Sequence, residues 1–327
     1  MMRALLWIAT ALVVLWSGYW FVGKSTVERG FEAFVLAAPG NGLTVSQTGY
    51  RVAGFPNRFD LTLTEPRVTD QRSEIRWEAP FVQVFSLSYR PWHVIAAFAP
   101  EQVIRTPAED ITLQSEKLQA SVVVSPSSAL TLDRTTFVGD AIRASSSLGW
   151  MLAADTLRFA TRSDPSQTNA YDIGLEVLGL SPDPALAARM PDLPPQIAFA
   201  RIDANATLSA PLDRFAAGSR PGLTALSLRE AVLTWGDLSL SAKGDLQVIN
   251  GLPEGRIALR ATGWRNLVVL ATSMGLITPE FAPTLTNMMQ AVAGSSGDPE
   301  VLEMPLIFAA GQMLLGPLPL GPAPRLN

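Results

Sequence analysis

The first feature of the chain is an uncharged apolar run that extends from Ala4 to Val22. As a helix rising about 1.5 Å per residue, it would extend roughly 28 Å, close to the ~30 Å hydrocarbon core of a bilayer. Arg3 and Lys24 flank the run. Its far end carries the aromatic residues that are typical of a membrane interface, Tyr19, Trp20 and Phe21. We therefore predict that residues 1–23 form a transmembrane anchor.

Two alternatives compete with an anchor. A cleavable signal peptide would have a core of 7–15 apolar residues followed by small residues at a cleavage site, whereas this run is longer and ends in bulky aromatics. A buried core helix is disfavoured because Trp7, Trp16 and Trp20 leave no polar face. A short basic head before a large C-terminal domain favours the head in the cytoplasm and the domain outside it.

The hydrophobic period changes after the anchor. Val27, Phe31 and Phe34 recur at helical spacing, so we predict a helical stalk over residues 24–39 that stops at the Pro-Gly-Asn-Gly segment 39–42. From Leu43 onward the period is two. Apolar residues then alternate with polar ones in many short runs, as in FDLTLT at 59–64, and Pro, Gly, Asn or Asp separate most of the runs.

These runs predict a mainly β (α+β) protein. We expect the N-terminal transmembrane helix to be followed by an elongated, largely antiparallel β-sheet domain with a few short helices. The strands fall into a first half at 40–165 and a second half at 166–327. The second half also contains a helical pair near 266–293.

Composition excludes several classes of function. The 25 Lys and Arg residues against 29 Asp and Glu residues give a net charge of −4, so the basic surface of a nucleic-acid binder is missing. The chain has no cysteine, which excludes disulfides, thiolate metal sites and cysteine nucleophiles. Charged residues make up 17% of the chain, against ~25% in a typical globular protein, which suits a large buried surface or an apolar cleft.

Catalytic and cofactor motifs do not stand out in the sequence. The lone histidine, His93, cannot build a histidine-rich metal site, and neither a nucleotide-binding glycine motif nor a G-x-S-x-G elbow occurs. We therefore expect no enzyme activity, no cofactor and no metal. A more distinctive segment is GFPNRF at 54–59, which we interpret as a turn that registers the first hairpin. Its Arg58 is a candidate contact for a lipid headgroup.

Aromatic side chains are concentrated in the predicted strands. They would form a closed core, or they would line an apolar groove if one side of the sheet stays open, and the residue pattern leaves both alternatives standing. The candidate groove residues are Trp77, Phe81, Phe85, Tyr89, Trp92 and Phe98.

The chain resembles the bacterial family of domain of unknown function 2125, which are envelope proteins of Gram-negative bacteria. The resemblance spans nearly the whole chain and is weakest over 265–300. It rests on LLWIATALVVLWSGYWFVG near the N-terminus, GFPNRFDLTLTEP at 54–66, WEAPFVQVFSLSYRPWHVIAAFAPEQ at 77–102, ITLQSEKLQASV at 111–122, AVLTWGDLSLSAKGDLQV at 231–248, GLPEGRIALRATGW at 251–264 and LLGPLPLGPAP at 314–324.

The resemblance implies a single-pass inner-membrane protein with a periplasmic C-terminal domain, and it brings no functional residues with it. The strand pattern is also similar in style to AsmA-like envelope proteins, whose β-grooves carry lipid. We expect a non-enzymatic protein that binds or hands on a lipid or another apolar envelope molecule. The alternative is a tethered scaffold with a closed core that recruits an envelope protein partner.

Overall fold

The structure is a computed structural model that describes residues 2–273, 275, 277–295 and 298–326. It begins with one long helix, α1 (Met2–Ala37), so the predicted anchor and stalk form a single continuous helix. A 3-10 turn, η1 (Ala38–Asn41), follows. Gly42 then takes a left-handed conformation with φ 78°, and its N–H bonds the carbonyl of Pro39. The Pro-Gly-Asn-Gly segment therefore ends the helix, as the sequence predicts.

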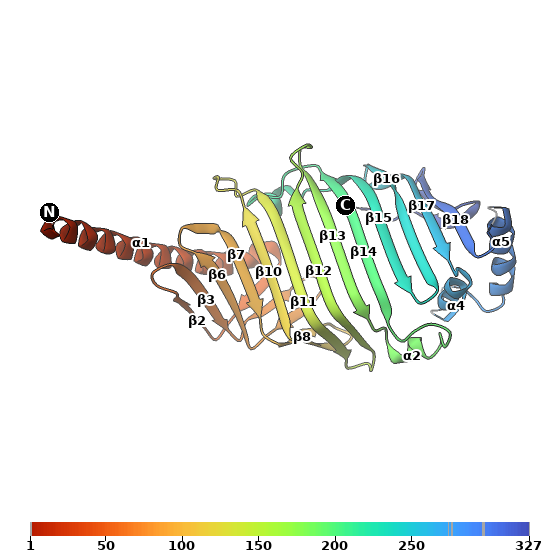
Figure 1. The fold of residues 1–327 in the computed structure, drawn as a ribbon, viewed down its shortest axis with the longest axis horizontal. Helices are drawn as coiled ribbons and strands as arrows, with labels where there is room; N and C mark the ends of the chain where they lie inside the picture. Colours follow the sequence, from red (N-terminus) through yellow and green to blue (C-terminus); the bar gives the residue numbers. More distant parts are fainter. Residues whose placement is uncertain (1, 274, 276, 296–297, 327) are drawn as a thin grey trace.

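The N-terminal part of α1 projects from one end of the molecule (Figure 1). Its apolar side chains are exposed, and Trp7, for example, retains 74% of its accessible surface. Among the described residues, this helix is the one long and apolar enough to span a membrane, by length and composition. The prediction of a long apolar N-terminal helix is confirmed.

Most of the rest of the chain forms one antiparallel sheet with a few short helices, which confirms the predicted fold class. Its strands are β1 Leu43–Ser46, β2 Gly49–Ala53, β3 Arg58–Thr64, β4 Arg67–Asp70, β5 Arg76–Glu78, β6 Phe81–Leu87, β7 Arg90–Phe98, β8 Glu101–Arg105, β9 Asp110–Gln114, β10 Lys117–Val124, β11 Leu132–Ser146, β12 Met151–Ser163, β13 Ala170–Leu180, β14 Ile197–Leu208, β15 Leu223–Trp235, β16 Leu238–Ile249, β17 Leu252–Thr262, β18 Val301–Ala309, β19 Gln312–Leu315 and β20 Leu318–Pro322.

The sheet has a simple part and a branched part. From β11 to β20 each strand pairs with the next along the chain, so the two predicted halves are joined by the β12–β13 pairing. The long strand β11 is the branch point, because residues 132–140 pair with β10 and residues 143–146 pair with β9. Ala141, with φ 50°, lies between these two segments and marks the change.

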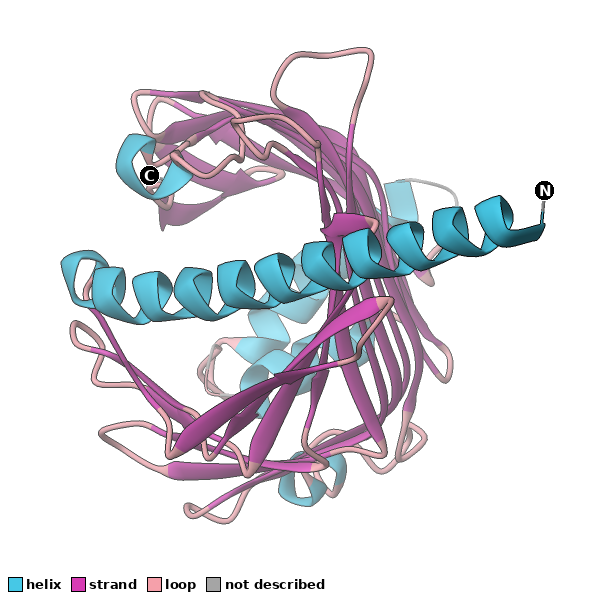
Figure 2. Cartoon of the chain, turned by 90° about the vertical axis from the view of Figure 1, so that its left-hand side faces the viewer, coloured by secondary structure: helices cyan, strands magenta, loops and turns pink. Residues whose placement is uncertain are grey.

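The two branches lead back to α1. One branch continues through β10, β7, β6, β3 and β2, and the other through β9, β8, β5, β4 and β1. Helix α1 contacts β1, β2 and β3 at the ends of both branches. Seen from that end, the sheet curves into the shape of a C that is open on one side, and α1 lies across it (Figure 2).

Two helices lie inside the curve at the far end, α4 (Arg265–Ser273) and α5 (Ala282–Ser295), which correspond to the predicted helical pair (Figures 1 and 2). They pack on a cluster of buried side chains that includes Ala261, Leu302 and Met304 from β17 and β18. These strand residues therefore define the concave face of the sheet. Two short helices, α2 (Pro184–Ala187) and α3 (Ala216–Ser219), lie in the connections between strands.

The centre of the α4–α5 cluster is Trp264, which is fully buried, and its indole N–H donates to the carbonyl of Pro299 at 3.1 Å. A neighbouring cluster surrounds Trp235, whose indole N–H bonds the carbonyl of Pro194 at 2.7 Å. Both tryptophans combine a large buried apolar area with a satisfied polar group. They hold the helices and the connections against the concave face.

We predict that Trp264→Ala destabilises the protein by about 3–5 kcal/mol, because it leaves a cavity and an unpaired carbonyl. Thermal unfolding of the full chain in detergent, followed by circular dichroism, measures this effect. Val269→Ala, at a half-exposed position on α4, is the control and should change stability by no more than about 0.5 kcal/mol. Equal melting temperatures for Trp264→Ala and the wild type would contradict the packing described here.

Candidate functional site

A single register row carries apolar side chains across the concave face from β18 to β2. Each member lies directly opposite the next on the neighbouring strand. We call it the apolar row: Met304, Leu259, Ala242, Ala231, Ile202, Leu175, Phe159, Phe137, Ala120, Ala96, Val84, Leu61 and Val52.

The apolar row crosses thirteen strands, which is twelve spacings of about 4.8 Å, or roughly 58 Å along the curved sheet. It begins beside α4 and α5 and ends beside α1. The next residue row faces the other side of the sheet and is mostly polar: Glu303, Arg260, Ser241, Val232, Arg201, Glu176, Arg158, Val138, Gln119, Ala97, Gln83, Thr62 and Arg51. The sheet is therefore amphipathic along most of its length.

Side chains in the middle of the apolar row are not sealed in a core. Phe137, Phe159 and Leu175 are half-buried, and Ile202 is 38% exposed although it faces the inside of the curve. A closed core would bury such residues almost completely. Of the two alternatives that the sequence leaves standing, this exposure favours the open groove.

A cavity of about 480 Å³ lies at the far end of the concave face. Its volume falls in the ~300–1,000 Å³ range of small-molecule sites. Leu267 of α4, Met289 of α5 and Leu315 of β19 form its walls, and strand residues form its floor. Its floor includes Leu175, Ile202, Ala231, Leu233, Leu240, Ala242, Leu259, Ala261, Leu302 and Met304.

Arg201, Ser241 and Arg260 also border this cavity. They belong to the neighbouring row, which faces the convex side, so the cavity meets their main chain and not the polar ends of their side chains. The side chains that face the cavity are aliphatic or methionine. Such a lining suits a flexible hydrocarbon ligand and cannot bind a charged one, because it offers no partner for the charge.

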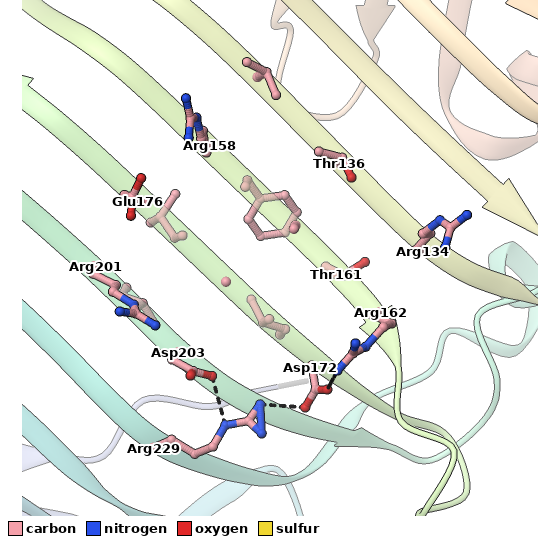
Figure 3. A pocket seen from close by; sticks show the side chains of 17 residues that line it. Arg134, Thr136, Arg158, Thr161, Arg162, Asp172, Glu176, Arg201, Asp203 and Arg229 are labelled. Atoms are coloured by element: carbon pink, nitrogen blue, oxygen red, sulfur yellow. Dashed lines mark hydrogen bonds and ion pairs between the residues drawn. The ribbon is translucent and has the colours of Figure 1, made fainter.

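A second cavity, of about 860 Å³, lies over β11 to β15, and both apolar residues and charged residues such as Arg158, Glu176 and Arg201 line it (Figure 3). These three charged residues belong to the row on the convex face. Asp172 accepts hydrogen bonds from Arg162 at 3.0 Å and Arg229 at 2.6 Å, and Arg229 also donates to Asp203 at 2.9 Å. A hydrogen bond from the Asn205 amide, with the nearby guanidinium groups, lowers the pKa of the Asp172 carboxyl. This network ties β12, β13, β14 and β15 together across the convex surface.

We predict that Asp172→Asn lowers stability by about 1 kcal/mol at neutral pH, since it removes charge-assisted hydrogen bonds that are partly exposed to solvent. The pKa of Asp172 is lower in the folded state, so its contribution is present above the unfolded value of about 3.9 and is lost as the pH falls through the folded value. The free energies of unfolding measured in urea should therefore differ between the variant and the wild type at pH 7 and become equal in acid. Asp133→Asn, at an exposed site on β11, is the control, and a similar loss there would contradict the assignment to the network.

The structure does not bring the six candidate aromatic residues onto one surface. Phe98 lies two residues after Ala96 and faces the concave side, where Trp77 of β5 packs edge-on to it with ring centroids 6.1 Å apart. Trp92 is half-buried in β7, where the pairing of β6 with β7 is irregular. Phe81 and Phe85 face the convex side, because their neighbours Val82 and Val84 face the concave one, and Tyr89 is exposed in the turn between β6 and β7.

Sequence reasoning missed the small residues at this end of the groove. Val84, Ala96 and Ala120 form the concave surface here, and their low volume draws less attention than the aromatic residues beside them. The only sequence signal for these residues is the two-residue period of the strands. A choice between the two faces of FVQVFSLSY would have needed the register with the neighbouring strands, which a single sequence does not give.

Arg58 lies at the α1 end of the sheet. Its guanidinium pairs with Asp60 at 2.6 Å and lies 5.8 Å from the centre of the Phe85 ring, on the convex side. Its main-chain carbonyl accepts a hydrogen bond from the indole of Trp20 at 2.8 Å. The turn before it is stabilised by an Arg58 N–H bond to the carbonyl of Gly54, as expected of a turn that registers the first hairpin. Headgroup contact by Arg58 stays a prediction.

Comparisons with known proteins give one match. The search of the curated proteins and the search of the solved structures found no match, so the resemblance to AsmA-like proteins is not shown. A family model described as "uncharacterized protein conserved in bacteria" matches residues 20–324, which cover the last part of the apolar run and the whole sheet. The chain therefore belongs to this bacterial family, domain of unknown function 2125.

Proposed function

We propose that this protein is a membrane-anchored, non-enzymatic carrier that holds the hydrocarbon part of a lipid, or of another apolar envelope molecule, against its concave face. The observation that carries the proposal is the apolar row, which continues for thirteen strands without a polar side chain. Its central residues are half-exposed, so a ligand can reach them.

The binding energy would come from burial of hydrocarbon. Each methylene group moved from water onto an apolar surface contributes about 0.8 kcal/mol. The cavity between the sheet, α4 and α5 offers an enclosed site, because helices and sheet line it on several sides. We place the end of the hydrocarbon chain there and the more polar part of the ligand toward the open side of the curve.

We also propose that α1 anchors the protein in the bacterial inner membrane with the sheet in the periplasm. The length of the apolar run and the bacterial family support this arrangement. A scaffold that recruits an envelope partner is the second candidate. The edge strand β20 (Leu318–Pro322) contains two prolines, which remove N–H donors that strand addition by a partner would use. That edge therefore favours the carrier over the scaffold.

The carrier proposal predicts cross-links from a phospholipid with a diazirine in its acyl chain to the concave strands β12–β17 and to α4 and α5. The full-length protein is irradiated in membranes that contain this lipid, and mass spectrometry locates the cross-linked peptides. Ile202→Asp should reduce the yield by roughly tenfold or more, because it places a carboxylate in the apolar row. Ala258→Asp, at an exposed convex position of β17, should leave the yield unchanged.

Three outcomes would reject the carrier: no cross-link to the sheet, cross-links confined to the convex face, or equal yields from the two variants. Circular dichroism of both variants shows whether they are folded. A ligand-free protein that instead co-purifies with an envelope protein in defined stoichiometry would support the scaffold.

A further inference from the structure

Three hydrogen bonds from aromatic residues on one side of helix α1 hold the helix against the end of the sheet. The indole of Trp16 donates to the main-chain carbonyl of Pro56 at 3.1 Å. The hydroxyl of Tyr19 donates to the main-chain carbonyl of Ser88 at 2.5 Å, and the indole of Trp20 to the main-chain carbonyl of Arg58 at 2.8 Å. The acceptors lie in or beside two turns, at residues 54–58 and 87–90. We call these two turns the tip.

Ring contacts strengthen this attachment. The Phe55 ring packs edge-on to Trp20 with centroids 5.4 Å apart and lies 6.2 Å from Phe21. Trp20, which is 4% exposed, also stacks on Phe59. Gly23 faces the Phe59 ring so closely that a Cβ atom would clash with it. These contacts fix the tip beside residues 16–23 of α1.

This part of α1 overlaps the end of the apolar run. Trp16 precedes Val22 by six residues, which is about 9 Å along a helix axis. If the membrane ended before Trp16, only the segment from Ala4 to Leu15 would remain to cross it, and these twelve residues span about 18 Å against a hydrocarbon core of ~30 Å. A spanning α1 thus carries the tip to the level of the membrane interface or below it.

The exposed side chains of the tip match that location. Phe55 is 53% exposed and Tyr89 is 56% exposed, and the exposed Pro91 of β7 comes directly after the second turn. Arg58, which pairs with Asp60, and Arg90 are also exposed and belong to the same two turns as these apolar groups. Aromatic side chains bordered by arginines are typical of segments that lie in the interface of anionic membranes.

We propose that the tip is inserted into the leaflet on the sheet's side of the membrane, with Phe55 and Tyr89 among the lipid chains and Arg58 and Arg90 at the headgroups. Val52 and Leu61, the last members of the apolar row, belong to the two strands joined by the first turn of the tip. If the proposed carrier function holds, a lipid could therefore pass from this leaflet to the apolar row without crossing water. The insertion itself does not depend on that function.

The absence of cysteine from the chain makes a direct test simple. Full-length Phe55→Cys and Tyr89→Cys proteins are labelled with the environment-sensitive dye NBD and reconstituted into vesicles of phosphatidylethanolamine and phosphatidylglycerol. Leu148→Cys is the control, because Leu148 is 68% exposed in the hairpin between β11 and β12. We expect blue-shifted emission at positions 55 and 89, and quenching by doxyl-labelled lipid several-fold stronger than at 148.

Emission and quenching at positions 55 and 89 that equal those at 148 would overturn the insertion. Circular dichroism and the retention of each labelled protein in the vesicles confirm that fold and anchor are intact. The result is independent of the cross-linking experiment. Cross-links in the groove with a water-exposed tip would refute the insertion alone, whereas an inserted tip without cross-links would refute the carrier alone.

Discussion

The structure depends on the strict pairing of strands whose side chains alternate between two faces. A slip of one residue between two neighbouring strands would move every side chain of one of them to the opposite face. Over thirteen strands, this pairing sets the residues of the apolar row on the concave face and a mostly polar row on the convex one. The hydrogen-bonded ladder thus converts a weak local alternation into a long, continuous apolar surface.

An apolar surface of this length is costly to leave in contact with water. In a sandwich, a second sheet would cover it. Here α4 and α5 cover one end around Trp264 and α1 contacts the other end around Trp20, while residues such as Ile202 remain accessible between them. On the convex side, the ion pairs around Asp172 hold four strands in register without adding apolar burial. The middle of the sheet is therefore held by its own ladder and by polar contacts more than by a core.

Much of the fold could be predicted from the sequence because the relevant signals are local. The uncharged run before Val22, the stop at Gly42 and the alternation from Leu43 onward depend on neighbouring residues alone. The candidate groove could not be located in the same way. Phe85 and Val84 are adjacent in the chain, and their assignment to opposite faces depends on Leu61 and Ala96, which lie on other strands. The attachment of α1 was equally hidden, since the carbonyls that receive its aromatic N–H and O–H groups have no sequence signature.

The chain of neighbour-to-neighbour hairpins from β11 to β20 has a consequence for the evolution of the family. Insertion or loss of a whole hairpin would lengthen or shorten the sheet by two strands and leave both termini of the groove intact. Insertion of a single strand would reverse the direction of everything after it and deliver α4 and α5 to the wrong edge. Members of different size are therefore expected to differ by multiples of about 25–30 residues, the length of one hairpin built from strands as long as β15 and β16 with their turns. The distance that the sheet extends away from α1 would be adjustable in the same discrete steps.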